Sequence, residues 1–142
     1  MTRLILSAKL FVFNENNEVL VLRRSETHPT NPHCTDMPGG IIESHEYELA
    51  AALRELREET SLSVDEKLCE LFFATTVQLP NGNSLSMLMY KIHLNSTPEV
   101  TISWEHESYE WCSIDDLLSR EDLDQPERSG VEYAMKHDLF AV

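Results

Sequence analysis

Several glutamates and an arginine in the segment Gly40–Leu62 have a spacing that suits chemistry on phosphates. Glu55, Glu58 and Glu59 are separated by three or four residues, so in a helix their carboxylates lie on one face. Such like charges repel one another unless a cation neutralises them. Mg²⁺ prefers carboxylate oxygens and keeps coordination positions for substrate phosphates. The spacing therefore indicates a divalent cation on this face, either Mg²⁺ or Mn²⁺.

A helix is expected here because apolar residues recur at helical spacing between the charged ones. These apolar positions are Leu49, Ala52, Leu53 and Leu56. The preceding Pro38-Gly39-Gly40 breaks regular structure and lets the backbone approach a ligand closely. Ser44 is the expected N-cap. The segment is thus predicted to be a loop followed by a helix.

The full spacing can be written G-x5-E-x7-R-E-U-x-E-E-x-G-U, where U is a bulky apolar residue, and in this form it resembles the Nudix box. The matching residues are Gly40, Glu46, Arg54, Glu55, Leu56, Glu58, Glu59 and Leu62. Ser61 stands where the pattern has its second glycine, and His45 replaces a commonly seen glycine. Because glycine permits a positive φ angle, we expect these two replacements to reshape or strain the helix ends.

A simpler explanation is a solvated acidic helix in which Arg54 forms an i,i+4 ion pair with Glu58. Such helix faces are common. The preceding Pro-Gly-Gly loop and the complete spacing favour the functional interpretation.

The Nudix resemblance implies a role for each residue. Glu58 and Glu59 are the expected metal ligands, and Glu55 either joins them or acts as the general base, with roles that can exchange between Glu55 and Glu58. Arg54 is expected to orient a glutamate through a charge-assisted hydrogen bond. The carbonyl of Gly39 is expected to reach the metal.

Family members often take another acid from a loop that precedes a strand tryptophan. Glu105, Glu107 and Glu110 all precede Trp111. Glu105 is the preferred candidate because it is far enough from Trp111 to lie in the loop, whereas Glu110 is expected on the strand. The alternative is that Glu105 is merely an exposed acid.

Contacts to the substrate are expected from Arg23 and Arg24 at the end of the second strand, where one of them could reach a phosphate, and from Gly40. Two solvated arginines are an equally simple explanation. Three aromatic residues could stack a nucleobase, but core packing is the simpler expectation for all of them: Phe11, Phe13 and Trp104.

The length of 142 residues predicts a single domain spanning residues 1–142. Eleven basic residues against 25 acidic ones give a formal charge of −14, which disfavours unassisted binding to nucleic acid or an anionic membrane. A polyphosphate substrate would therefore need metal bridging. The apolar run near the N-terminus is short and is followed by Lys9, so it predicts a strand rather than a signal segment, and no stretch is predicted to span a membrane.

The three cysteines, Cys34, Cys69 and Cys112, predict neither a disulfide framework nor a zinc site and fit a reducing cytoplasm best. His28 and His33 lie close to Cys34 in the sequence. A merely polar loop explains them better than a soft-metal site does.

Alternating apolar residues and turn signals predict the remaining elements. Strands are expected at Leu4–Phe13, Val19–Arg24, Leu68–Leu79, Ser84–Leu94, Val100–Trp104 and Tyr109–Cys112, and further helices at Ile114–Leu118 and Pro126–Phe140. This order predicts an α/β fold with a central mixed sheet between helical layers. The Nudix resemblance implies the same α/β/α sandwich.

The expected function is metal-dependent hydrolysis of a pyrophosphate bond in a nucleoside diphosphate linked to another group, such as a nucleoside triphosphate or a nucleotide sugar. The substrate would be a small molecule, and the box does not identify it. The main alternative is a catalytically weak Nudix-like module that binds a nucleotide for regulation. A decapping-type enzyme is disfavoured by the acidic charge. The sequence does not determine the oligomeric state, and a homodimer is one of the open alternatives.

Overall fold

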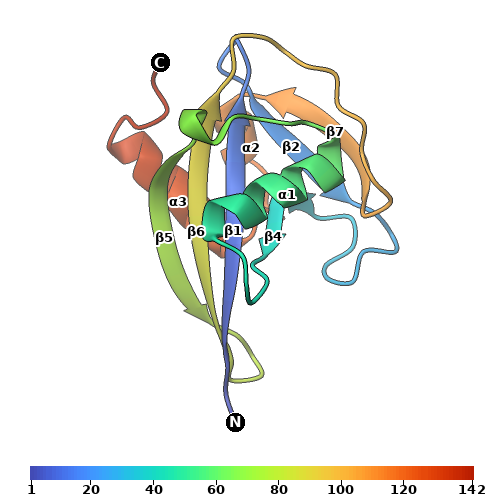
Figure 1. The fold of residues 1–142 in the computed structure, drawn as a ribbon. Coiled ribbons are helices and arrows are strands. Elements are labelled where there is room, and N and C mark those ends of the chain that lie inside the picture. Colours follow the sequence, from blue (N-terminus) through green and yellow to red (C-terminus); the bar gives the residue numbers. More distant parts are fainter.

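The structure is a computed structural model that describes all 142 residues (Figure 1). The strands are β1 (Leu4–Phe13), β2 (Val19–Arg24), β3 (Thr35–Asp36), β4 (Gly39–Ile41), β5 (Glu70–Gln78), β6 (Ser84–His93) and β7 (His106–Cys112). The helices are α1 (Glu48–Thr60), α2 (Ile114–Leu118) and α3 (Gln125–Lys136), with a 3-10 turn at Glu66–Leu68.

All seven strands belong to one mixed sheet with the path β3-β2-β1-β6-β5. β1 is parallel to β6 and antiparallel to β2 and β4, and β7 is antiparallel to β2. The β5–β6 hairpin turns at the Asn-Gly signal, as the sequence predicts. The expected mixed sheet is confirmed.

The strand periodicity of two residues divides the core between the two faces of the sheet. Ala8, Leu10 and Val12 of β1 belong to the cluster that contains Leu56 of α1. Phe11 and Phe13 face the other way and pack in the cluster that includes residues of α2 and α3. Figure 1 shows α1 in front of the sheet and the other two helices behind it. The α/β/α sandwich is therefore confirmed.

β1 and β2 separate soon after the turn that joins them, because their only paired residues are Phe13 and Val19. Further along, β4 takes the place beside β1, and β3 takes the place beside β2 at Leu22 and Arg23. The connection from β3 to β4 therefore crosses the gap between the separated strands. This crossing brings Gly39 and Gly40 beneath α1.

The sequence predictions were wrong at several places. Gly39 and Gly40, predicted to lie in a loop, form β4 with Ile41 and pair with β1. Val100–Trp104 is not a strand, because the N–H groups of Thr101 and Ser103 donate to carbonyls at the end of α1 instead of to a neighbouring strand. Trp104 is not in the core, since 66% of it is exposed. The N-cap of α1 is Tyr47 and not Ser44. The last helix also stops at Lys136, short of the expected Phe140. No helix has both the length and the apolar surface needed to cross a membrane.

Candidate active site

Three glutamates of α1 differ in exposure to solvent, which rises from Glu59 through Glu55 to Glu58. Glu59 is buried, and the N–H of Gly39 donates to its Oε1 over 2.9 Å. The side chain of Glu55 is 17% exposed, and that of Glu58 is 54% exposed. The three carboxylates thus extend from the backbone of β4 to solvent.

Close contacts require both glycines of β4, Gly39 and Gly40. A Cβ atom on Gly40 would lie 3.0 Å from the carboxyl carbon of Glu55. Gly39 has φ +134°, and a Cβ atom there would lie 2.1 Å from the carbonyl oxygen of Ala8. The absence of a side chain on Gly39 therefore lets β4 lie against β1, and its absence on Gly40 lets the Glu55 carboxylate approach the β4 backbone.

Arg54 binds three carboxylates at once. Its Nε and Nη2 donate to the two oxygens of Glu46 over 2.6 and 2.9 Å. Its Nη1 donates to Glu55 over 3.0 Å and to Glu58 over 3.2 Å. The i,i+4 pair with Glu58 is therefore present, but as one arm of a larger cluster. The hydrogen bonds from Arg54 lower the pKa of Glu46 to about 2. This geometry is suited to orienting Glu55 and Glu58.

The buried carboxylates lack sufficient positive charge. Burial raises the pKa of Glu59 to about 8, although Lys9 and the N–H of Gly39 act in the opposite direction. Burial also raises the pKa of Glu55, against the effect of Arg54, and the nearby charges of Glu58 and Glu105 add to the rise. An additional cation would relieve this imbalance, and an all-oxygen set of carboxylates and a carbonyl is the chemistry that Mg²⁺ or Mn²⁺ prefers. These residues fit a divalent cation.

The three acids outside the box have different partners. Glu105 lies in the loop just before β7, where its Oε2 is 3.9 Å from Nε2 of His28, and its charge helps to raise the pKa of Glu55. Glu107 is 2.6 Å from Nδ1 of His33. Glu110 lies on the strand and pairs with Arg120. This arrangement places Glu105, rather than the other two, beside the box.

A buried group centred on Asp36 was missed from the sequence, and we call it the Asp36 hub. It consists of Asp36 (β3), Lys9 (β1), Arg24 (β2) and His106 (β7). The Asp36 carboxylate is 3.1 Å from Lys9 Nζ, 3.3 Å from Arg24 Nε and 2.9 Å from His106 Nε2. These partners outweigh burial and hold the pKa of Asp36 well below its usual range. The sequence signal that could have indicated this group is Lys9, a charged residue within the otherwise apolar strand β1. Arg24, predicted to contact substrate, has its guanidinium engaged here.

His28, Asp36 and His106 offer ligand atoms within 4.8 Å of one another. A metal ion among them would meet the positive charges of Lys9 and Arg24, which already neutralise the only carboxylate of the three. The acidic face of α1 is therefore the better cation site. Cys34 is not part of this group.

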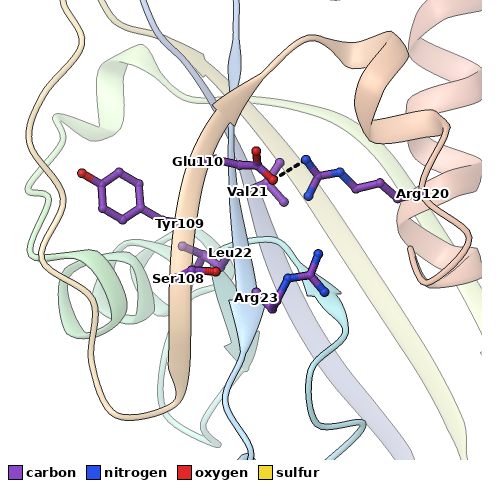
Figure 2. Close-up of a pocket in the computed structure, with 7 residues that line it drawn as sticks. All are labelled: Val21, Leu22, Arg23, Ser108, Tyr109, Glu110 and Arg120. Atoms are coloured by element: carbon purple, nitrogen blue, oxygen red, sulfur yellow. Dashed lines mark hydrogen bonds and ion pairs between the residues drawn. The ribbon is translucent and has the colours of Figure 1, made fainter.

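Arg23 is separate from the acidic cluster. It lines a hollow of about 220 Å³ with Ser108, Glu110 and Arg120, among other residues. Figure 2 shows the Arg23 and Arg120 side chains on one side of β7 and the Tyr109 ring on the other. Arg23 donates to the carbonyl of His33 over 2.6 Å, and its side chain is 40% exposed. Its Nη1 also lies 3.5 Å from Oδ2 of Asp122. Its predicted contact with substrate stays a prediction.

The replaced glycines of the box have different outcomes. Ser61 adopts the left-handed conformation, with φ 65°, and its N–H caps α1 by donating to the carbonyl of Arg57. The helix therefore ends as a glycine would end it, with local strain. His45 does not have a positive φ angle, so the histidine in place of glycine causes no left-handed backbone strain.

Comparisons with known proteins agree with this geometry. The family profile described as NUDIX domain matches residues 3–133. The asymmetrical bis(5'-nucleosyl)-tetraphosphatase of Caenorhabditis elegans is 28% identical over 88 residues, which cover 61% of this chain and 64% of that protein. The aligned part thus spans less than two thirds of this relative's length.

Two solved structures share the fold over nearly the whole chain. The crystal structure of a MutT protein from Methanosarcina mazei Go1 has a TM-score of 0.85 and 26% identity, and the match covers 96% of each chain. The crystal structure of a C. elegans Ap4A hydrolase binary complex has a TM-score of 0.68 and 22% identity, covering 94% of this chain and 98% of that one.

Proposed function

The chain belongs to the NUDIX domain family, and from this premise we propose that it is a metal-dependent hydrolase that cleaves a pyrophosphate bond in a nucleotide derivative. The substrate class is a nucleoside diphosphate linked to another group. The cation would be Mg²⁺ or Mn²⁺.

One observation carries this proposal: the carboxylates of Glu55 and Glu59 converge on the backbone of Gly39 and Gly40. Glu59 accepts the N–H of Gly39, and Glu55 lies against Gly40. Carboxylates held this close together and partly or fully buried destabilise the folded protein unless protons or a cation neutralise them. A cation on this set would also neutralise the charge of an anionic pyrophosphate.

The residues that would hold the cation are Glu55, Glu58, Glu59, Glu105 and the Gly39 carbonyl. When bound, a divalent cation neutralises phosphate charge and lowers the pKa of a coordinated water. Glu55 and Glu58 are the candidates for the general base, because both accept hydrogen bonds from Arg54 and extend toward solvent. Arg54 would hold whichever of them removes the proton in a fixed orientation.

Substrate identity is the open part of the proposal. The name of the C. elegans relative makes dinucleoside tetraphosphates one candidate, and nucleoside triphosphates and nucleotide sugars are the others. Arg23 is the candidate phosphate contact, because its guanidinium is partly exposed near the end of β2. The free cysteines keep a reducing cytoplasm as the proposed location.

The alternative, a regulatory module that binds nucleotides without hydrolysing them, predicts binding without turnover. The test is a hydrolysis screen with Mg²⁺ or Mn²⁺ over nucleoside triphosphates, dinucleoside polyphosphates, ADP-ribose and nucleotide sugars. Release of phosphate, pyrophosphate or a nucleoside monophosphate from one class would support the enzyme. Tight nucleotide binding with no product from any class would support the module.

A further inference from the structure

We propose that the hydrogen bond between Asp36 and His106 positions Glu105 for cation binding. This inference rests on the proposed function, because it concerns the same acidic site. Asp36 and His106 would act as positioning residues and would not touch the cation or the substrate.

The bond joins β3 to β7, the strands next to Gly39 and to Glu105 in the sequence. His106 directly follows Glu105, and Asp36 precedes Gly39 by three residues. The distance between His106 Nε2 and Asp36 Oδ2 is 2.9 Å, and both side chains are buried. We therefore expect a change in this bond to shift Glu105 relative to the backbone of Gly39.

The Asp36 side of the bond is anchored firmly. Its carboxylate also accepts the N–H of Met37 over 3.0 Å. Lys9 Nζ donates to Asp36 and to the carbonyl of Met37, each over 3.1 Å, and lies 3.5 Å from the carbonyl of Gly39. Asp36 is thus fixed relative to the start of β4. Its bond to His106 holds the imidazole ring at a fixed position relative to the same strand.

The His106 side has few other constraints on its ring. The Nδ1 atom is buried without a hydrogen-bond partner, so the bond to Asp36 is the one hydrogen bond that this ring makes. The backbone on either side is held by Ser103, whose N–H donates to the Glu59 carbonyl, and by Ser25, whose N–H donates to the Glu105 carbonyl. These backbone bonds hold the path of the loop, whereas the ring ties the first residue of β7, next to Glu105, to β3.

The architecture explains why such a bond is needed. β1 and β2 are paired only at Phe13 and Val19, so no continuous ladder of backbone hydrogen bonds joins the two halves of the sheet near the site. The Asp36 hub joins side chains from β1, β2, β3 and β7 in this gap. Second-layer hydrogen bonds of this kind orient metal ligands and change metal affinity when they are removed.

The test measures Mn²⁺ affinity by electron paramagnetic resonance at equilibrium, without substrate. His106→Leu deletes the bond, and His106→Gln keeps an N–H that can donate to Asp36. We expect His106→Leu to weaken Mn²⁺ binding about tenfold, with His106→Gln restoring most of the affinity. If His106→Leu does not fold, His106→Asn replaces it, because its shorter amide stays polar but does not reach Asp36. Val131→Ala, a core substitution on α3, is the control for general destabilisation and should leave Mn²⁺ affinity unchanged.

A double-mutant cycle with Glu105→Gln separates positioning from a structural role. In the wild-type background, Glu105→Gln should weaken Mn²⁺ binding, and in the His106→Leu background it should add nothing. Independent, additive losses would overturn the inference, as would full Mn²⁺ affinity in His106→Leu or in Glu105→Gln alone. A wild-type protein that neither binds Mn²⁺ nor hydrolyses any substrate would overturn the proposed function itself, which is a different result.

Discussion

Glu127 should reduce the stability of the protein as the pH rises, because it is a buried carboxyl without a hydrogen-bond partner at Oε1. It lies in the first turn of α3. Burial raises its pKa to about 7 from an ordinary 4.5, with Lys9 opposing the rise and Asp124 and Asp36 adding to it. The perturbation we consider is Glu127→Gln, which keeps the size and removes the ionisation.

The magnitude follows from linkage between protonation and folding. The rise in pKa from 4.5 to about 7 corresponds to about 3 kcal/mol, since one pKa unit is about 1.4 kcal/mol. Because the folded state of the wild-type protein holds the proton more tightly than the unfolded state, its stability falls as the pH rises from about 4.5 to about 7 and then levels off. The amide of the Glu127→Gln variant has no such proton, so the variant lacks this part of the pH dependence.

The assay is urea unfolding of both proteins at pH 5 and pH 8. The free energy of unfolding of Glu127→Gln, relative to wild type, should be higher at pH 8 than at pH 5 by about 2–3 kcal/mol. Glu132→Gln, on the exposed side of the same helix, should show no such change. A difference between Glu127→Gln and wild type that is the same at both pH values would refute the reasoning.

Three further predictions follow from the site. Ser61→Gly should raise the free energy of unfolding by about 0.5–1 kcal/mol in thermal melts, because it relieves the left-handed strain at the end of α1; a lower melting temperature would contradict this. Gly39→Ala should lower the free energy of unfolding by more than about 3 kcal/mol in denaturant titrations. Gly82→Ala, whose Cβ would meet only a methyl group at 3.3 Å, should lower it by about 1 kcal/mol; equal losses in the two variants would argue against the close contact at Gly39. Glu105→Gln should lower kcat/KM by about tenfold or more, and Glu107→Gln should leave it near wild type; the reverse order would identify Glu107 as the acid outside the box.

The elements that the sequence predicts well are those with a strong local pattern. β1, β2 and α2 begin and end at the predicted residues, because alternating apolar residues and clear turn signals determine them locally. The box helix and its three glutamates were predicted from helical spacing, which fixes which carboxylates share a face. The start of α1 was misplaced because Ser44, a good cap by residue type, lies in a turn that precedes the helix.

The Asp36 hub could not be predicted from the sequence. Its four members come from four strands, and the contact between them depends on the separation of β1 from β2 and on the crossing of the β3–β4 connection. No local spacing encodes that arrangement. The error at Val100–Trp104 has a similar origin. The segment has the apolar pattern of a strand, but it has no neighbouring strand to pair with and lies along the end of α1 instead.

The most direct test of the central claim is the dependence of turnover on a cation held by the α1 carboxylates. Hydrolysis of the best substrate from the screen should be measured for wild type and Glu58→Gln, across a titration of Mg²⁺ and with excess chelator. The proposed function predicts that the chelator abolishes wild-type turnover and that Glu58→Gln, while folded, loses about a hundredfold or more in kcat. Wild-type turnover that persists in chelator, or a Glu58→Gln enzyme with normal kcat at ordinary Mg²⁺ concentrations, would contradict it.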